Sequence, residues 1–175
     1  TRSGLLSVLK SMGADIQILN QKIECNEDVG DLLIKSSSLH GVEISGAIIP
    51  NIIDEIPILS IAASCAEGKT IIKDAKELRV KESDRLEAIA SGLKALNVPH
   101  YLYEDGIEIS GVKEISPSDE QIDSFGDHRI AMSFLISSLI STKDIKVLNC
   151  ENIYTSFPSF FDEMNKLGLS MEKYG

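Results

Sequence analysis

The chain lacks the features that mark membrane, nucleic-acid-binding or disulfide-rich proteins. It has no tryptophan, 5% aromatic residues, three cysteines, and 17 Lys or Arg against 27 Asp or Glu. The resulting net charge of −10 argues against a surface for nucleic acid or anionic membranes, which would need a basic face. The longest nearly apolar stretch, residues 130–140, is too short to span a bilayer. What remains is the composition of an ordinary globular protein, 43% hydrophobic and 25% charged. The negative net charge does not exclude small anionic ligands, because a local cluster of cations can override it.

The cysteines and histidines indicate neither disulfides nor a metal site. Cys25, Cys65 and Cys150 are odd in number and far apart, and the three histidines also lack metal-ligand spacing. We therefore predict reduced, buried, structural thiols in a cytoplasmic protein, and no bound metal. No signal peptide is visible. The chain begins with Thr1 and runs directly into a helical pattern, which indicates a fragment of a longer protein.

An internal repeat organises the chain. "DEIPILSIAASC" starts at Asp54 and "DHRIAMSFLISS" starts 73 residues later at Asp127, and each is typical of an apolar helix. After each helix come a charged turn and a short run typical of a strand, "KTIIKD" and "DIKVLN". Residues 85–111 predict a helix, a strand, a tight Asp105-Gly106 hairpin and a second strand. Residues 4–20 and 160–174 repeat the helix, turn and strand. On one face the helix after residue 85 places Leu86, Ile89, Ala90, Leu93 and Leu96.

We read this pattern as nearly three copies of one unit, the first lacking its opening helix and strand. Such a period predicts a pseudo-symmetric α/β (α+β) domain with helices packed on sheets. Residues 1–175 show no linker or low-complexity segment, so we expect a single domain.

Cations stand at two of the predicted helix starts, where a helix dipole disfavours them. Ser83 or Asp84 is the expected N-cap of the middle helix, and Asp84 with Glu87 makes a capping-box pattern. Arg85 then lies in the first turn, at a cost of a few tenths to about 1 kcal/mol relative to an anion. A bound phosphate or carboxylate would turn this cost into a gain, because free backbone N–H groups and a guanidinium would converge on it.

The segment "GDHRIAMS" repeats this arrangement, with Asp127 as the expected N-cap and His128 and Arg129 in the first turn. The repeat supplies a comparison, because Arg85 aligns with Phe160 and Arg129 with Ile56. The unit therefore tolerates apolar residues at helix starts and does not itself require the cations.

A plainer interpretation also stands. The charges would then be a solvated face, with Lys81 and Arg85 paired to Glu77 or Asp84, and His128 would be structural. Asp54 would be an ordinary N-cap.

Three motifs carry a specific resemblance. "ELRVKESDR" (77–85), "DEIP" (54–57) and "FGDHRIAM" (125–132) are similar to the C-terminal lobe of the 5-enolpyruvylshikimate-3-phosphate synthase family. The likeness runs from "TRSGLLSVLKSMGAD" through "TSFPSFFDEMNKLG" and leaves the N-terminal lobe unrepresented. The resemblance implies an inside-out α/β barrel lobe of nearly three βαβαββ units, with the active site in the cleft between two lobes. It also implies a cytoplasmic enzyme of the shikimate pathway that is monomeric at full length.

The family joins phosphoenolpyruvate to shikimate 3-phosphate by addition and elimination, without metal or organic cofactor. The resemblance makes Asp54 the proton acceptor from the 5-hydroxyl and Glu82 the acid that moves a proton to and from the methylene carbon. Two carboxyl groups in different environments suit that chemistry.

The resemblance also assigns the charged ligands of the site. Lys81 would bind at the shikimate phosphate and the reacting centre. Arg85 and Arg129 would bind the carboxylate and phosphate of phosphoenolpyruvate, for which guanidinium forks are suited. His128 would orient neighbouring groups, and Glu77 stands where some members carry an asparagine that touches shikimate phosphate.

One departure is visible. Some members carry a lysine just before "FP" of the C-terminal motif, where this chain has Thr155 and Ser156. In those members the lysine is a further ligand of phosphoenolpyruvate. Here either a hydroxyl group takes its place or another cation does, and the sequence leaves this choice open.

Two other functions remain as alternatives. A related transferase acts on UDP-N-acetylglucosamine, but its arginine motifs do not read "RVKESDR" or "DHRIAM". The other is a non-catalytic anion-binding module, although the carboxylates of Asp54 and Glu82 beside the arginines are unfavourable for simple anion binding.

Overall fold

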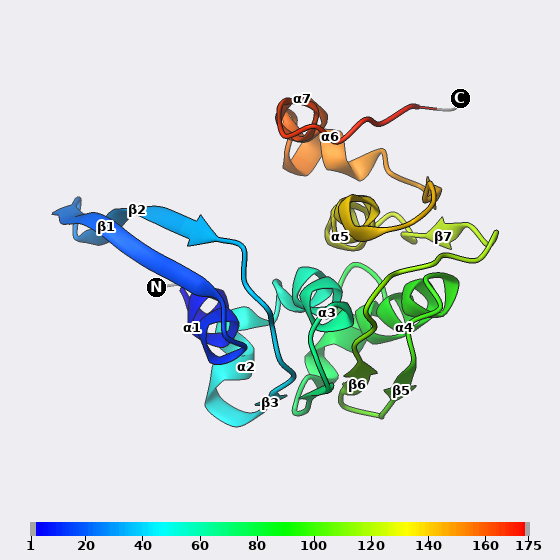
Figure 1. Cartoon of the computed structure of the whole chain (residues 1–175), viewed down its shortest axis with the longest axis horizontal. Coiled ribbons are helices and arrows are strands. Elements are labelled where there is room, and N and C mark those ends of the chain that lie inside the picture. Colours follow the sequence, from blue (N-terminus) through cyan, green and yellow to red (C-terminus); the bar gives the residue numbers. More distant parts are fainter. Residues whose placement is uncertain (1–2, 174–175) are drawn as a thin grey trace.

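The computed structural model describes residues 3–173 as a mixed arrangement of helices and short sheets (Figure 1). The elements in chain order are α1 (Gly4–Ser11), β1 (Asp15–Glu24), β2 (Glu27–Lys35), β3 (Glu43–Ile44), η1 (Gly46–Ile48), α2 (Ile49–Ile52), α3 (Ile56–Ser64), β4 (Lys69–Ile72), η2 (Lys76–Val80), α4 (Arg85–Ala95), β5 (His100–Leu102), β6 (Ile107–Ser110), β7 (Ile122–Asp123), α5 (His128–Ser137), η3 (Ser138–Ile140), β8 (Val147–Leu148), α6 (Asn152–Ser156) and α7 (Phe160–Lys166).

The middle unit is complete. Its strands pair in the order β3-β4-β6-β5, with β3 parallel to β4 and with β6 antiparallel to both of its neighbours. Helix α3 lies between β3 and β4 in the chain, and α4 lies between β4 and β5, so the unit is βαβαββ. The predicted hairpin at Asp105-Gly106 is confirmed, because β5 and β6 pair across it.

The flanking copies are partial. The first consists of α1 and the antiparallel hairpin β1-β2, as the repeat predicts. In the third, β7 and β8 pair in parallel around α5. The strand expected after α7 is wrong for residues 169–173, which have no regular secondary structure, while Tyr174 lies outside the described residues. An extended segment is stable as a strand only when it pairs with other strands, and residues 167–173 belong to no sheet.

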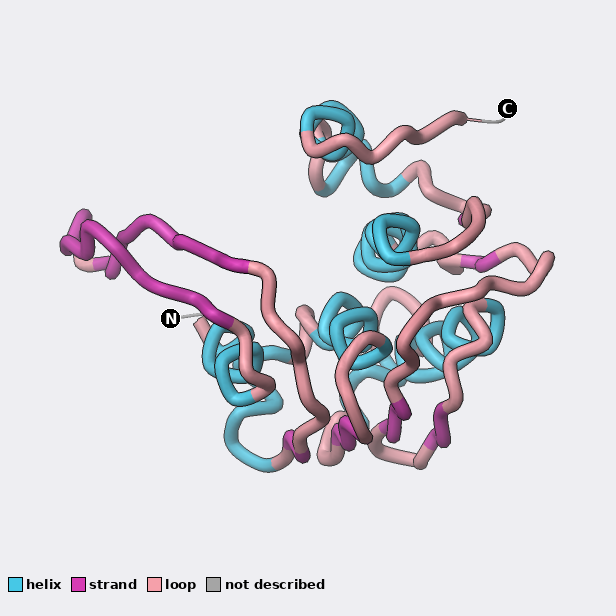
Figure 2. The backbone as a smooth tube through the Cα atoms, in the orientation of Figure 1, coloured by secondary structure: helices cyan, strands magenta, loops and turns pink. Residues whose placement is uncertain are grey.

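The helices lie inside and the sheets outside. Helix α3 is apolar and buried along most of its length, and it packs against α4 and α5. The four-stranded sheet covers α3 and α4 on one side, and the β1-β2 hairpin projects from the body (Figures 1 and 2). The predicted core face of α4 is confirmed, since none of its five residues is more than 7% exposed.

The prediction of buried cysteines is wrong. Cys25 and Cys65 are exposed and Cys150 is half-buried, although all three are free thiols. Cys25 lies in the turn between β1 and β2, Cys65 follows the end of α3, and Cys150 follows β8. Each therefore stands at the end of an element, where the interior does not cover it.

Within residues 3–173, no single helix has the length and apolar character needed to cross a bilayer, and only the bent pair Gly46–Ile52 with Ile56–Ser64 meets both criteria together.

Helices α4 and α5 approach closely at Gly92. A Cβ at this position would lie 2.1 Å from a ring carbon of Phe134, which is 1% exposed. A real side chain cannot occupy that space, so the glycine sets the distance between the two helices.

We predict that Gly92→Ala destabilises the chain by about 2 kcal/mol, because overpacking a buried contact outweighs the gain in helix propensity. Urea-unfolding curves of the two proteins would measure the difference. Ser91→Ala, on the exposed side of the same helix, should change the unfolding free energy by less than about 0.5 kcal/mol. Equal stability of Gly92→Ala and the parent would show that α5 moves away without cost.

Candidate functional site

The starts of α4 and α5 have the caps that the sequence predicts. The Asp84 carboxylate accepts a hydrogen bond from the backbone N–H of Glu87 at 3.1 Å. The Asp127 carboxylate accepts one from the backbone N–H of Arg129 at 2.9 Å. Both N-caps are therefore confirmed, and the cations that follow them stand in the first helical turns.

The interpretation of Asp54 as a plain N-cap is wrong. Helix α3 begins at Ile56, its N-cap residue is Glu55, and no side chain caps it. The Asp54 carboxylate instead contacts Arg85, with 3.0 Å between NH1 and Oδ1. Arg129 lies on the other side of this carboxylate, 3.7 Å from NH2 to Oδ2. The Asp54 carboxylate therefore contacts two guanidinium groups and does not cap α3.

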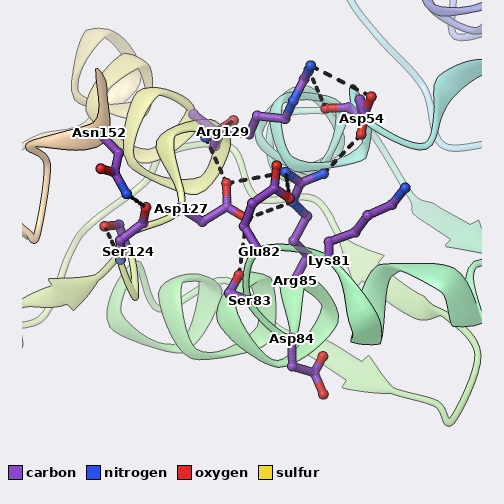
Figure 3. Close-up of polar contacts among 12 residues, drawn as sticks. Asp54, Lys81, Glu82, Ser83, Asp84, Arg85, Ser124, Asp127, Arg129 and Asn152 are labelled. Carbon is purple, nitrogen blue, oxygen red and sulfur yellow. Dashed lines mark hydrogen bonds and ion pairs between the residues drawn. The ribbon is translucent and has the colours of Figure 1, made fainter. Parts of the chain in front are cut away.

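Arg85 is the centre of the cluster (Figure 3). Its side chain is 0% exposed. Besides Asp54, it donates from Nε to Asp127 Oδ2 at 2.7 Å and from NH2 to Glu82 Oε2 at 2.6 Å. The three carboxylates come from the segment before α3, the loop before α4 and the start of α5. Neither Glu77 nor Asp84, the partners of the plainer interpretation, pairs with Arg85 within residues 3–173.

Asp127 is fully buried and has two functions. One oxygen caps α5, and the other binds Arg85 and accepts from the Ser83 hydroxyl at 3.2 Å. Burial alone would raise the pKa of this carboxyl, but the Arg85 guanidinium and the hydrogen bonds from Arg129 N–H and Ser83 outweigh it and hold the pKa below its usual value. Asp127 is therefore a carboxylate at neutral pH.

The Asp54 carboxyl is also held in its charged form. Burial raises its pKa, but Arg129, Arg85 and Lys81 more than compensate, so the pKa lies below the ordinary value. Arg129 additionally donates from NH1 to the backbone oxygen of Asp54 at 3.0 Å. The candidate proton acceptor is thus ionised and engaged by cations.

Lys81 and His128 lie at the margins of the cluster. The Lys81 ammonium forms an ion pair with Glu77, as the plainer interpretation expects. In Figure 3, Lys81 extends from the loop toward the Asp54 side of Arg85. His128 is the first residue of α5 and is half-buried, and its ring makes no hydrogen bond within the described part of the chain.

The anions expected at these helix starts are supplied by the protein itself. The cations Lys81, Arg85 and Arg129 stand among more carboxylates than cations, namely Asp54, Glu55, Glu77, Glu82 and Asp127. The cluster therefore carries no excess positive charge. A doubly or triply charged substrate would have to displace a carboxylate or meet further cations.

One residue of the cluster was predicted only in part, and another position stays open. The sequence predicts Asp127 as a cap, but no local signal marks its second oxygen as a partner of Arg85, 42 positions away. Thr155 and Ser156, at the end of α6, are exposed and make no polar side-chain contact within residues 3–173.

We predict that Asp127→Asn destabilises this chain by about 1.5–3 kcal/mol at pH 7, because it removes the one fully buried carboxylate partner of Arg85 and leaves only Asp54 and Glu82 among the described residues. The folded pKa of Asp127 is depressed. Its contribution is therefore complete above the unfolded pKa of about 3.9 and disappears as the pH falls through the folded value. The difference in urea-unfolding free energy between parent and variant should shrink toward pH 3. Asp144→Asn, at an exposed position, is the matched control, and a difference that stays constant with pH would contradict the ion pair.

Comparisons with known proteins agree on one family. The family model for EPSP synthase (3-phosphoshikimate 1-carboxyvinyltransferase) matches residues 1–164. The 3-phosphoshikimate 1-carboxyvinyltransferase of Petrotoga mobilis is 55% identical over 167 residues, which cover 95% of this chain and 38% of that protein. The enzyme of the same name from Legionella pneumophila (strain Paris) is 45% identical over 174 residues, or 99% of this chain and 40% of that one.

Solved structures give the same result. An EPSP synthase from Acinetobacter baumannii superposes with a TM-score of 0.92 at 42% identity, over 98% of this chain and 40% of that one. The enolpyruvyl transferase NikO from Streptomyces tendae shares the fold, with a TM-score of 0.74 at 17% identity over 96% of this chain and 35% of that one. The chain spans about two fifths of the length of the EPSP synthases it matches. With the repeat, the inside-out fold and the charged helix starts, these matches establish that the chain belongs to the EPSP synthase family.

Proposed function

We propose that the full-length protein transfers the enolpyruvyl group of phosphoenolpyruvate to the 5-hydroxyl of shikimate 3-phosphate and releases phosphate. The observation that carries this proposal is the gathering of Asp54, Glu82, Lys81 and Arg129 around the buried Arg85. The identity of 42–55% to proteins named for this activity supports it. It also favours shikimate 3-phosphate over UDP-N-acetylglucosamine as the acceptor.

The proposed roles follow from the charges. Asp54 accepts the proton of the attacking hydroxyl, while Glu82 gives a proton to the methylene carbon in the addition and removes one in the elimination. Lys81, Arg85 and Arg129 bind the anionic groups of the substrates. His128 orients neighbouring groups, and Glu77 lies at the edge of the phosphate site.

Substrate binding would itself activate Asp54. In the ligand-free chain, Arg129 and Arg85 lower its pKa and make it a weak base. An incoming carboxylate or phosphate would compete for these guanidinium groups and add negative charge nearby. Both effects raise the pKa of Asp54 and strengthen it as a proton acceptor at the moment when the hydroxyl arrives.

We also propose that residues 1–175 are most of the C-terminal lobe and that an N-terminal lobe completes the site. The lack of excess positive charge in the cluster supports this, because two multiply charged substrates need more positive charge than these residues supply. The free thiols of the three cysteines fit a reducing cytoplasm.

This chain alone is predicted to be inactive, and mixing it with the separately produced N-terminal lobe of the same protein should restore turnover. The reason is that substrates bound by one lobe lack half of their ligands and a closed, water-poor cleft. Phosphate release from phosphoenolpyruvate plus shikimate 3-phosphate is the measurement. No activity in the mixture, with both halves folded and in contact by circular dichroism and sedimentation, would contradict the proposed function.

In the full-length enzyme, Glu82→Gln and Arg129→Ala should each lower kcat by at least about tenfold, because one removes the proton and the other an anion ligand. Glu87→Gln is the matched control, since Glu87 is an exposed carboxylate in the first turn of α4. Rates of the first two variants near that of the control would refute the assigned roles.

A further inference from the structure

The loop that carries Lys81 and Glu82 has little support from its own backbone. Within residues 3–173, the N–H and C=O groups of residues 81–83 form no backbone–backbone hydrogen bond. Leu78, just before this loop, is buried, whereas Val80 is largely exposed. Side chains must therefore hold the loop in place, and on the α5 side Ser83 does so through Asp127.

Arg79 holds the other side of the loop. It donates from Nε to the backbone oxygen of Glu104 at 2.6 Å and from NH2 to that of Tyr103 at 2.7 Å. Its NH1 donates to Asp84 Oδ2 at 2.9 Å. The other oxygen of Asp84 caps α4. One guanidinium thus joins the β5-β6 turn, the loop and the start of α4.

We propose that Arg79 is a positioning residue of the enzyme, which fixes Lys81 and Glu82 in their working places without touching the substrates. This inference rests on the proposed function. Arg79 contacts none of the cluster around Arg85 in the described chain. Its effect passes through Asp84 and the β5-β6 turn to the loop.

The fork of Arg79 is specific to arginine. Its three nitrogen atoms bind three acceptors in fixed directions, and its side chain is only 25% exposed. Lysine keeps the charge but has a single nitrogen atom and cannot reproduce this geometry. Lys76 provides a contrast, because it reaches the Glu104 carboxylate at 2.6 Å while both side chains are more than two thirds exposed. Such a pair contributes little.

The test uses the full-length enzyme with Arg79→Lys and Arg79→Gln, and Lys76→Gln as the matched control. We expect both Arg79 variants to lower kcat at least about tenfold and to raise KM for each substrate at least about fivefold, because Lys81 and Glu82 lose their alignment. Lys76→Gln should stay within about twofold of the parent. A purely structural role would reduce the amount of active enzyme and leave KM unchanged, and that result would overturn the proposal.

Asp84→Asn is a second test, for the case that the Arg79 variants fold poorly. Asparagine caps a helix as well as aspartate does, but it gives Arg79 a neutral partner. We expect a smaller change of KM in the same direction. An unchanged KM in Asp84→Asn and in Arg79→Lys would count against the proposal.

A crystal structure of full-length Arg79→Lys gives a measurement that does not depend on activity. We expect the backbone of residues 81–83 to move while α4 and the β5-β6 hairpin stay in place. An unmoved loop overturns the positioning role whatever the kinetics show. Absence of phosphate release by the parent enzyme would instead overturn the proposed function alone.

Discussion

The buried guanidinium of Arg85 is the interaction on which the rest of the structure depends. Taking a charge out of water costs several kcal/mol, which only well-placed partners offset. Asp54 and Asp127, which occupy equivalent positions in the repeat 73 residues apart, both bind it, and Glu82 adds a third carboxylate. Because these partners belong to separate segments, pairing Arg85 fixes how the starts of α3, α4 and α5 meet. The same contacts that close the fold therefore build the site.

The repeat shows that this arrangement is a departure from an apolar default. Ile56 begins α3 and Phe160 begins α7, and both are buried hydrophobic residues. Arg85 begins α4 and is equally buried. Replacing a buried ion cluster by well-packed apolar residues of similar volume is often neutral or stabilising. Retaining charge at this helix start makes sense if binding or catalysis requires it, as expected where a site costs stability.

Features that depend on a few neighbouring residues could be predicted from the sequence. The Asp84 and Asp127 caps, the Asp105-Gly106 hairpin and the apolar face of α4 are set within one or two turns of chain. The partners of Arg85 could not be predicted, because Asp54 and Asp127 lie 31 and 42 positions away. The exposure of Cys65 was missed for a similar reason. Whether a helix end is covered depends on elements distant in the chain.

The carboxylates around Arg85 suggest how one cluster can serve both an empty and an occupied site. Without substrate, Asp54 and Glu82 neutralise the buried Arg85, and Asp54 also lies against Arg129. A bound anion competes with these carboxylates for the same donors. Under the proposed function, part of its binding energy would go into releasing Asp54 and Glu82, the two groups proposed to exchange protons with the substrates. We therefore expect this lobe alone to bind the substrates weakly, and the two carboxylates to become more reactive once a substrate is bound.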